Sequence, residues 1–333
     1  MTEVLQVFRK SDADFFSLEN VFSSIRPYLN NTVSIEKYNL HTRAAGINAI
    51  LKNLFYLNKN KDKAKVFHIT GDVHYSVFAF PRSKTILTIH DCVFLQNPSP
   101  FKRWLFKKLW LQWPVKYSRM ITTISEATRK EIISNTGCDE KKIVVIPDPL
   151  SKHFSYVKKN FNKSSPVVLQ IGTWPNKNLN RVATALKGLP CKLSIIGKLS
   201  EEQKKLLSEN NIDYSNHFHL SDQDLVKQYA DADIVVFAST FEGFGLPVIE
   251  AQAMGRPLVT SNISPMKEVA GEGACFVNPL EIDSIREGIM KVIEDDKFRE
   301  TIIAKGLENV RKYDPEKIAD QYLFLYKKIM ANN

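Results

Sequence analysis

Short apolar runs alternate with stretches of helical periodicity along most of the chain. The runs lie at 4–8, 65–70, 84–90, 120–125, 143–147, 166–172, 191–197, 218–220, 233–238, 257–260 and 274–277. Several are apolar at nearly every position, which is typical of strands buried on both faces of a parallel sheet. The segments 125–135 and 283–296 carry apolar residues at helical spacing. This alternation predicts two doubly wound α/β domains.

A polar segment at 147–166 separates the two halves, because it holds three prolines and shows no periodicity. We therefore predict an N-terminal domain over 1–150 and a C-terminal domain over 165–315. A final amphipathic helix over 316–333 is expected to pack back toward the N-terminal domain. Ligands of such folds bind beyond the carboxyl ends of the strands, so we expect the active cleft between the two domains.

The composition is typical of a soluble globular protein: of 333 residues, 44% are hydrophobic and 25% are charged. No apolar run reaches the roughly 18 residues that cross a bilayer. The N-terminus lacks the basic-then-apolar pattern of a signal peptide. The four cysteines are scattered singly, which suggests neither a zinc site nor a disulfide framework. Together these features predict a reduced, cytoplasmic protein.

Positive charge is concentrated in the first half. Residues 1–150 hold 22 Lys and Arg against 13 Asp and Glu, whereas the remainder holds 24 against 23. Such a field favours an anionic partner, namely nucleic acid, a membrane face or a phosphorylated substrate, although basic surfaces are also common without one. The segment 101–120 combines Trp104, Trp110 and Trp113 with six cationic residues. It suits either an interfacial helix on an anionic membrane or a core helix whose charged face is solvated.

The stretch FEGFGLPVIE, at 241–250, places two carboxylates around a turn that leads into a helix. Pro247 suits the start of that helix, and Gly243 and Gly245 let the backbone approach a ligand closely. Free amides and the helix dipole make such a terminus an anion site. Glu242 and Glu250 could accept hydrogen bonds from vicinal hydroxyls. The combination suits a nucleotide sugar, and a loop with a capping acid is the plain structural alternative.

The run 225–279 resembles the donor-binding segment of glycosyltransferase family 4, whose motif is Glu, seven residues, Glu. Further landmarks of that family follow in the expected order at 88–91, 121–132, 145–154, 171–186 and 193–198. The resemblance implies the GT-B fold, with two Rossmann-like domains facing a central cleft. It also implies a retaining, metal-independent enzyme that moves a hexose from a UDP- or GDP-linked sugar to a glycan or lipid-linked acceptor. Cell-surface polysaccharide or lipopolysaccharide assembly is the implied setting.

The same resemblance implies roles for individual residues. Glu250 would hold the ribose hydroxyls, Glu242 would contact the transferred sugar, and Lys177 would neutralise the leaving diphosphate, where fixed positive charge lowers the barrier. His90 would contact the sugar near the reacting carbon. The leaving diphosphate itself could assist the acceptor hydroxyl, so no dedicated nucleophile is needed. The remaining predicted donor-binding residues are Gly172, Thr173, Lys198, Gly243, Phe244, Gly245 and Leu246.

The sequence departs from the family pattern at two places. Many relatives carry an arginine shortly after the glycine of the first donor-domain strand, where this chain has Thr173. Lys198 is the candidate replacement for that charge; otherwise the phosphate clamp is weaker than usual. Many relatives also have a glycine-rich loop after their first strand, which is missing here. The acceptor side is therefore unlike that of the better-understood members.

Acceptor contacts are predicted from two turns of the N-terminal half. Gly71, Asp72 and His74 follow the strand at 65–70, and Arg9 and Lys10 follow the first strand. A plain turn with satisfied polar groups is the alternative for the first set. Both turns come after predicted strands, at the edge where ligands of such folds bind.

The tripeptide Asp-Ala-Asp occurs at 12–14 and at 231–233 and resembles a metal-binding motif of another glycosyltransferase class. The second copy joins a predicted helix to a predicted strand, so its acids are expected to solvate a junction. We therefore expect no metal in the site.

Two other interpretations remain open at this stage. One is a GT-B-shaped epimerase or phosphorylase, which an incubation of donor without acceptor would reveal. The other is a basic protein that binds nucleic acid or a membrane without catalysis. No RNA-binding signature or helix-turn-helix pattern accompanies the charge, so we expect no nucleic-acid partner. Peripheral attachment to the inner face of the membrane fits a lipid-linked acceptor.

Overall fold

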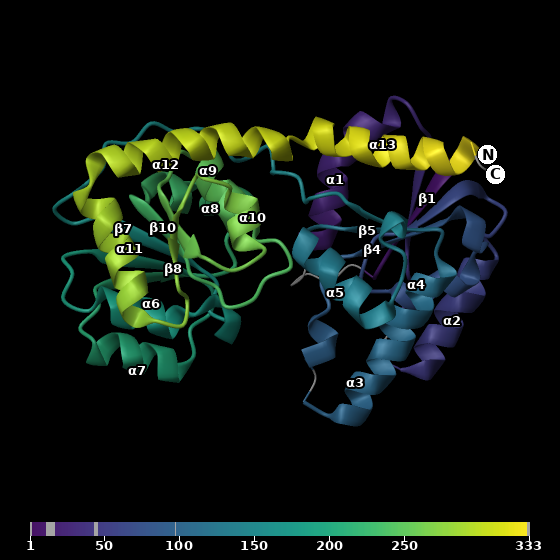
Figure 1. The fold of residues 1–333 in the computed structure, drawn as a ribbon, viewed down its shortest axis with the longest axis horizontal. Helices are drawn as coiled ribbons and strands as arrows, with labels where there is room; N and C mark the ends of the chain where they lie inside the picture. Colours follow the sequence, from purple (N-terminus) through teal and green to yellow (C-terminus); the bar gives the residue numbers. More distant parts are fainter. Residues whose placement is uncertain (1, 11–16, 43–45, 97, 332–333) are drawn as a thin grey trace. The chain divides into compact units, whose positions relative to one another are not determined.

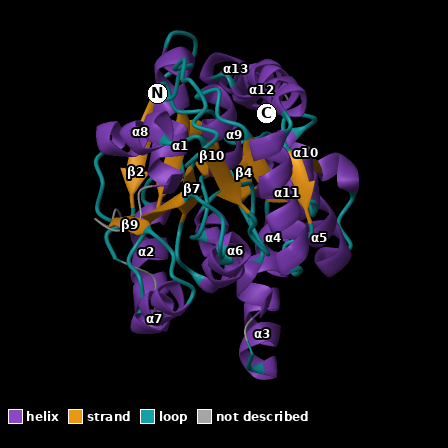
Figure 2. Ribbon diagram, turned by 90° about the vertical axis from the view of Figure 1, so that its left-hand side faces the viewer, coloured by secondary structure: helices purple, strands orange, loops and turns teal. Residues whose placement is uncertain are grey.

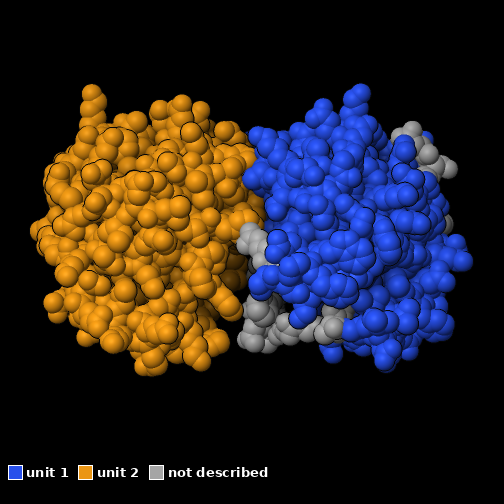
Figure 3. Space-filling view, turned by 60° about the horizontal axis from the view of Figure 1, so that its bottom comes forward, with its two compact units in different colours: residues 1–149, 315–333 blue, residues 150–314 orange. Residues whose placement is uncertain are grey.

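The structure is a computed structural model that describes residues 2–10, 17–42, 46–96 and 98–331. The chain forms two compact units (Figure 3). Unit 1 comprises Met1–Pro149 and Pro315–Asn333, and unit 2 comprises Leu150–Asp314. The change of unit lies inside the predicted linker, and the C-terminal helix belongs to unit 1. Each unit contains one six-stranded sheet with helices around it (Figures 1 and 2).

Unit 1 has the strand order β2-β1-β3-β4-β5-β6, and all neighbours are parallel. The strands are β1 (Thr2–Phe8), β2 (Ile35–Asn39), β3 (Ala64–Ile69), β4 (Thr85–Ile89), β5 (Met120–Thr123) and β6 (Ile143–Val145). The main helices are α1 (Ser17–Asn30), α2 (Ile47–Asn58), α3 (Pro100–Phe106), α4 (Trp113–Tyr117), α5 (Glu126–Thr136) and α13 (Pro315–Ala331). Buried side chains of α1 and α13 share one apolar cluster with the sheet.

A buried polar chain fixes α13 to the sheet of unit 1. The Nδ1 atom of His68 lies 2.7 Å from the hydroxyl of Tyr326, and its Nε2 atom lies 2.7 Å from Oγ1 of Thr88. The hydroxyl of Thr88 in turn lies 2.6 Å from Oγ1 of Thr122 on β5. Burial lowers the pKa of His68 to about 3, so the ring is neutral at physiological pH. The helix is thus held by directional bonds as well as by apolar packing.

Unit 2 has the parallel order β12-β11-β10-β7-β8-β9. The strands are β7 (Val167–Ile171), β8 (Lys192–Ile196), β9 (Tyr214–His217), β10 (Ile234–Phe237), β11 (Leu258–Ser261) and β12 (Cys275–Val277). The helices are α6 (Leu179–Leu186), α7 (Glu201–Glu209), α8 (Asp222–Asp231), α9 (Leu246–Ala253), α10 (Met266–Ala270), α11 (Ile282–Glu294) and α12 (Asp296–Asn309). Because β10 pairs with β7, the loops that follow these two strands leave the same edge of the sheet.

Two sequence predictions about strands need correction. The strand predicted at 218–220 is wrong, because β9 ends at His217, Phe218 is 53% exposed and His219 has a positive φ of 54°. The sequence of β9 is polar, so a search for apolar runs does not find this strand; an edge strand need not be apolar on both faces. The edge strand β2 is absent from the prediction for the same reason.

One helix boundary also differs. The helix predicted over 283–296 ends at Glu294, because Asp295 caps a new helix by accepting a hydrogen bond from the amide of Phe298.

The segment 101–120 forms α3, a π-helical turn at Lys107–Gln112, and α4. Leu111 is fully buried and Trp110 is partly buried, whereas Phe101, Trp104 and Trp113 are 68%, 56% and 49% exposed. One part therefore packs in the core and another presents aromatic rings outward, and contact with a membrane stays a prediction. Among the described residues, no helix combines the length and hydropathy that a bilayer span requires.

Candidate active site

The loop after β7 brings Lys177 against the sheet edge of unit 2. Gly172 has φ +88°, and a Cβ atom there would lie 2.6 Å from Cγ of Lys177. Only glycine therefore combines this backbone conformation with the close passage of the lysine side chain. The ammonium group of Lys177 donates to Oε1 of Glu242 at 2.6 Å and lies 4.9 Å from the ring centroid of Phe237. The position of the Lys177 side chain thus depends on the absence of a side chain at Gly172.

Glu242 is held by one of its two oxygens. Besides Lys177, its Oε1 atom accepts from the hydroxyl of Ser239 at 2.6 Å and from the side-chain amide of Asn176 at 3.4 Å. The side chain is 13% exposed. Its Oε2 atom forms no hydrogen bond with the residues that the structure describes, so it is left to accept a hydrogen bond from a ligand.

Glu250 lies on α9, one turn into the helix. Its Oε2 atom accepts a hydrogen bond of 2.6 Å from the buried hydroxyl of Tyr229. Burial raises the pKa of Glu250 to about 7, although the bond from Tyr229 and the charge of Lys177 lower it. Lys177 forms an ion pair with Glu242, and its charge also acts on Glu250, so the three groups lie in one electrostatic environment. Like Glu242, Glu250 keeps one oxygen without a hydrogen bond to the described residues.

The start of α9 follows the predicted turn. Gly245 has a left-handed conformation, with φ 101°, and no side chain caps the helix there. Pro247 occupies the first turn, so its missing N–H costs no helical hydrogen bond. The ring of Phe244 is buried against Tyr313, with centroids 5.6 Å apart. Of the turn residues Gly243 to Leu246, Phe244 can therefore offer a ligand its backbone but not its ring.

Thr173, which stands where relatives carry an arginine, ties two loops together. Its hydroxyl donates to the carbonyl of Lys198 at 2.8 Å, and a Cβ atom on Gly197 would lie 3.0 Å from its side chain. The side chain of Lys198 is exposed and makes no ion pair with described residues. Lys198 therefore carries a free charge at the end of β8, next to β7. Its role as a replacement for arginine stays a prediction.

Unit 1 brings three of its predicted residues, Asp72, His74 and His90, into one small cavity of about 180 Å³, which Arg9, Lys10 and Gly71 do not line. Its lining residues are Asp72, His74, His90, Asp91, Phe94, Phe106 and Trp110. Nε2 of His90 lies 2.9 Å from the carbonyl oxygen of Thr70. Nδ1 of His74 lies 2.5 Å from the carbonyl oxygen of Trp110, and burial lowers the pKa of His74. Each ring has one nitrogen anchored on the backbone, so both rings are oriented.

The turn after β3 is itself tied down. Gly71 and Asp72 have positive φ angles of 138° and 48°. The carboxylate of Asp72 forms an ion pair of 2.7 Å with Arg9, and its carbonyl accepts from the indole of Trp110 at 3.1 Å. The charge of Arg9 is therefore partly neutralised by Asp72, whereas Lys10 is exposed. The two turns predicted to contact an acceptor thus meet in the structure.

The acids of the second Asp-Ala-Asp lie at the junction of α8 and β10, but only Asp231 is exposed there; the prediction that both acids solvate the junction is wrong for Asp233. Asp233 is buried, accepts from the amides of Asn162 and Val167 at 3.1 and 2.9 Å, and pairs with Lys159 at 3.4 Å. The first copy, at 12–14, lies outside the described residues. Within the described ranges, no three His, Cys, Asp or Glu side chains gather as metal ligands would. The metal-free expectation itself remains a prediction.

Sequence reasoning missed the residues that orient the carboxylates. Tyr229 precedes Glu250 by 21 positions, and Ser239 and Asn176 belong to different loops. Asn176 could have been suspected because it neighbours Lys177. Tyr229 could not, since its aromatic position on α8 is indistinguishable from an ordinary core residue.

Comparison with known proteins agrees with this geometry. A sequence model described as Glycosyl transferases group 1 matches residues 152–309, and one described as Glycosyltransferase Family 4 matches residues 26–151. The chain therefore resembles glycosyltransferase family 4, as its motifs predicted. The first match covers the donor-binding segment, and the second covers most of the N-terminal unit.

Several relatives of this chain are named as bacterial glycosyltransferases. It is 28% identical to O-antigen chain mannosyltransferase B of Escherichia coli over 73% of this chain and 70% of the relative. It is 25% identical to a Campylobacter jejuni N,N'-diacetylbacillosaminyl-diphospho-undecaprenol alpha-1,3-N-acetylgalactosaminyltransferase, over 85% and 82%. The chain spans only 32% of serotype-specific mannosyltransferase WbdA and 61% of O-antigen chain mannosyltransferase RfbU.

Solved structures identify the fold. Sucrose-phosphate synthase from Thermosynechococcus elongatus superposes with a TM-score of 0.80 at 16% identity, over 100% of both chains. Anabaena HepE, solved with UDP and glucose, gives 0.78 at 14% identity, over 98% of this chain and 100% of that chain. The predicted GT-B class, with two doubly wound α/β domains, is confirmed.

Proposed function

We propose that this protein transfers a hexose from a nucleotide-diphosphate sugar, UDP- or GDP-linked, to a glycan or lipid-linked acceptor, with retention at the anomeric carbon and without a metal. Assembly of a bacterial surface polysaccharide or lipopolysaccharide is the proposed setting, since relatives are named for O-antigen synthesis. Mannose is the first sugar to test because several relatives are named mannosyltransferases.

The observation that carries the proposal is the convergence of Lys177, Glu242 and Glu250 from two loops and a helix. Each carboxylate has one oxygen held by the protein and one without a partner among the described residues. Vicinal hydroxyls need such acceptors at fixed positions. The lysine supplies positive charge where a departing diphosphate gains negative charge, which lowers the barrier to its departure.

The reaction would use unit 2 for the donor and unit 1 for the acceptor. Glu250 binds ribose, Glu242 orients the sugar, and the amides after Glu242 meet sugar and diphosphate. In unit 1, the cavity with His90, His74 and Asp72 offers hydrogen-bonding side chains beside the rings of Phe94 and Trp110. A hydroxylated acceptor fits this lining better than an apolar one.

Peripheral contact with an anionic membrane is part of the same proposal. Phe101 and Trp104 are exposed with centroids 6.3 Å apart, next to the exposed Lys102 and Arg103. Aromatic rings and cations together favour the interface of an anionic bilayer. Sedimentation with phosphatidylglycerol vesicles should fall for Phe101→Ser/Trp104→Ser. Equal sedimentation would contradict this contact and leave the transfer reaction standing.

A thermal-shift panel tests the donor site. The protein is heated with UDP, GDP, ADP, TDP and their sugar conjugates, each with and without EDTA. A ligand at about 100 times its dissociation constant adds roughly 2.7 kcal/mol, which raises Tm by several degrees. We expect one base to stabilise the protein despite EDTA, and Glu250→Ala, unlike the exposed control Glu287→Ala, to lose the shift. Stabilisation by none of them would overturn the proposal.

Incubation of the stabilising donor without acceptor separates transfer from epimerisation. A transferase leaves the donor largely intact or hydrolyses it slowly, whereas an epimerase converts it to a second nucleotide sugar. Appearance of such an epimer would replace the transferase proposal.

A further inference from the structure

Cations of unit 1 gather at the amino ends of three neighbouring strands. Arg82 precedes β4, Arg119 precedes β5 and Lys142 precedes β6. These strands are parallel neighbours, so their first residues share one edge of the sheet. His90 follows β4 at the opposite edge. The cations therefore belong to a different place from the cavity described above.

Two adjoining hollows of about 520 and 700 Å³ form at this edge and share Arg82, Asp139 and Lys142. We call them together the basic pocket. Its charged residues are Arg82, Lys116, Arg119, Lys141, Lys142, Lys328 and Asp139. Six cations thus face one carboxylate, and Oδ1 of that carboxylate already accepts from the amide of Lys141 at 2.9 Å.

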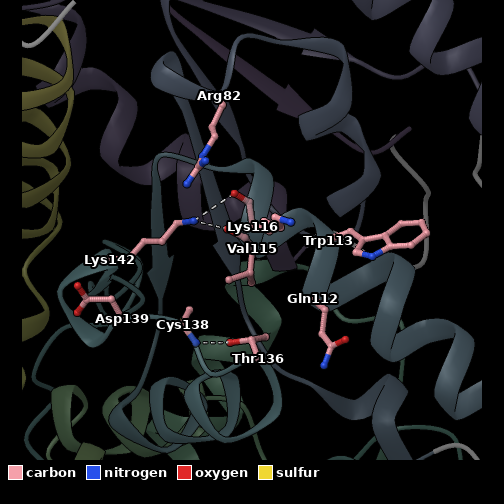
Figure 4. Close-up of a pocket in the computed structure, with 9 residues that line it drawn as sticks. All are labelled: Arg82, Gln112, Trp113, Val115, Lys116, Thr136, Cys138, Asp139 and Lys142. Carbon is pink, nitrogen blue, oxygen red and sulfur yellow. Dashed lines mark hydrogen bonds between the residues drawn. The ribbon is translucent and has the colours of Figure 1, made fainter.

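Lys142 is fixed inside the basic pocket. Its ammonium group donates to the carbonyl oxygens of Val115 and Lys116 at the end of α4 (Figure 4). In the same view, the guanidinium of Arg82 and the ammonium of Lys142 point toward one another. Burial lowers the pKa of Lys142, and the charges of Arg82 and Arg119 lower it further. Like charges are thus held together at a cost that an anion would relieve.

The two arginines are available to such an anion. Among the described residues, neither the Arg82 nor the Arg119 side chain forms a hydrogen bond or ion pair. A guanidinium presents a planar fork of donors that matches phosphate oxygens. Trp113, 49% exposed, lines one wall of the pocket (Figure 4).

We propose that the basic pocket binds a phosphate group, carried either by a soluble phosphate or diphosphate or by a lipid headgroup. Arg82 and Arg119 would donate hydrogen bonds to its oxygens, and the ammonium group of Lys142, held by the end of α4, would supply a fixed positive charge. The site is separate from the donor site of unit 2, and it does not depend on which nucleotide sugar that site takes.

The test uses the full chain carrying Lys177→Ala, which weakens the diphosphate site of unit 2. Arg82→Gln/Arg119→Gln is compared with Lys52→Gln/Lys61→Gln, a double change of exposed cations on unit 1 with the same loss of charge. One arm titrates inorganic diphosphate by calorimetry. The other sediments the protein with phosphatidylcholine vesicles, with and without phosphatidic acid. Circular dichroism melting checks that all variants fold.

We expect Arg82→Gln/Arg119→Gln to weaken phosphate binding by at least about tenfold relative to the control pair, because charge-assisted hydrogen bonds are lost. If Arg82→Gln/Arg119→Gln binds inorganic diphosphate more weakly than the control pair, the ligand is a soluble phosphate. If it is weakened only in sedimentation with vesicles that contain phosphatidic acid, the ligand is a lipid headgroup. Equal binding by the two double variants in both arms would overturn the proposal, since the effect would then be one of net charge. Absence of binding in both arms would overturn it as well.

Discussion

The two units handle positive charge in opposite ways. In unit 2, Lys177 is 21% exposed and its charge is matched at 2.6 Å by Glu242. In unit 1, Arg82 and Arg119 lie beside Lys142 with a single carboxylate, Asp139, in the same pocket. A paired lysine has its geometry fixed before a ligand arrives, which suits the proposed stabilisation of developing charge. A group of like charges has no such internal balance, and an external anion would relieve its repulsion.

The largest expected effect comes from breaking the paired charge. Lys177→Ala should lower kcat by about 100-fold, as does removal of one group that stabilises developing charge. Steady-state kinetics with the donor identified by thermal shift measures it. Lys187→Ala, an exposed lysine ten positions later, is the control and should leave kcat unchanged. Full activity in Lys177→Ala would remove the lysine from the reaction.

The position of that charge can be shifted without removing it. Gly172→Ala would place Cβ 2.6 Å from Cγ of Lys177 at a φ of +88°, whereas Gly188→Ala has φ +73° and nothing within 4 Å. Both should lose about 1–2 kcal/mol of unfolding free energy from backbone strain. Only Gly172→Ala should also lower kcat, by about tenfold or more, since a misplaced catalytic group is costly. Equal kinetics in the two variants would mean that Gly172 serves the backbone alone.

Glu250 links stability and binding through pH. Its pKa of about 7 is raised above the unfolded value of 4.5, so the folded state retains a proton that the unfolded state releases. Stability should therefore fall as pH rises from about 4.5 to about 7, by up to about 3 kcal/mol. Glu250→Gln should flatten this profile and stabilise the ligand-free protein at pH 8.

The same variant should weaken donor affinity by about tenfold at pH 8, because the ionised carboxylate is the stronger acceptor. Chemical denaturation and calorimetric titration across pH measure the two effects, with Glu287→Gln as the exposed control. A donor affinity that is the same in Glu250→Gln and wild type at pH 8 would contradict contact with the ribose.

The smallest effect concerns the unpaired charges of unit 1. Arg82→Gln/Arg119→Gln should raise the Tm slightly at low salt, because repulsion at Lys142 is relieved. The difference should disappear near 1 M salt, where the screening length is about 3 Å. Lys177→Met should do the reverse and lower the Tm, since it leaves Glu242 unpaired. A drop in Tm for the arginine double variant at low salt would show that these cations have partners in the folded protein.

The turn and helix start of the candidate donor site could be predicted from sequence because short stretches of residues specify them. Glycine, the two acids and proline at 242–250 specify a turn and a helix start without help from elsewhere. The apolar strands predicted at 166–172 and 233–238 indicate the edge of the sheet at which that turn lies. The edge strands β2 and β9 were missed or misplaced because half-exposed strands carry polar residues that no periodicity distinguishes from loops.

By itself, the sequence determined the two α/β units, the conformation around Gly245 and the candidate pair Glu242 and Glu250. Only the tertiary structure decided which residues meet across the chain. The hydrogen bond from Tyr229 to Glu250 depends on how strands and helices are ordered in space. The same is true of the grouping of cations at the starts of β4, β5 and β6. Local propensity acts over a few residues, whereas strand order is set by burial summed over a whole unit, so these contacts leave no local pattern to read.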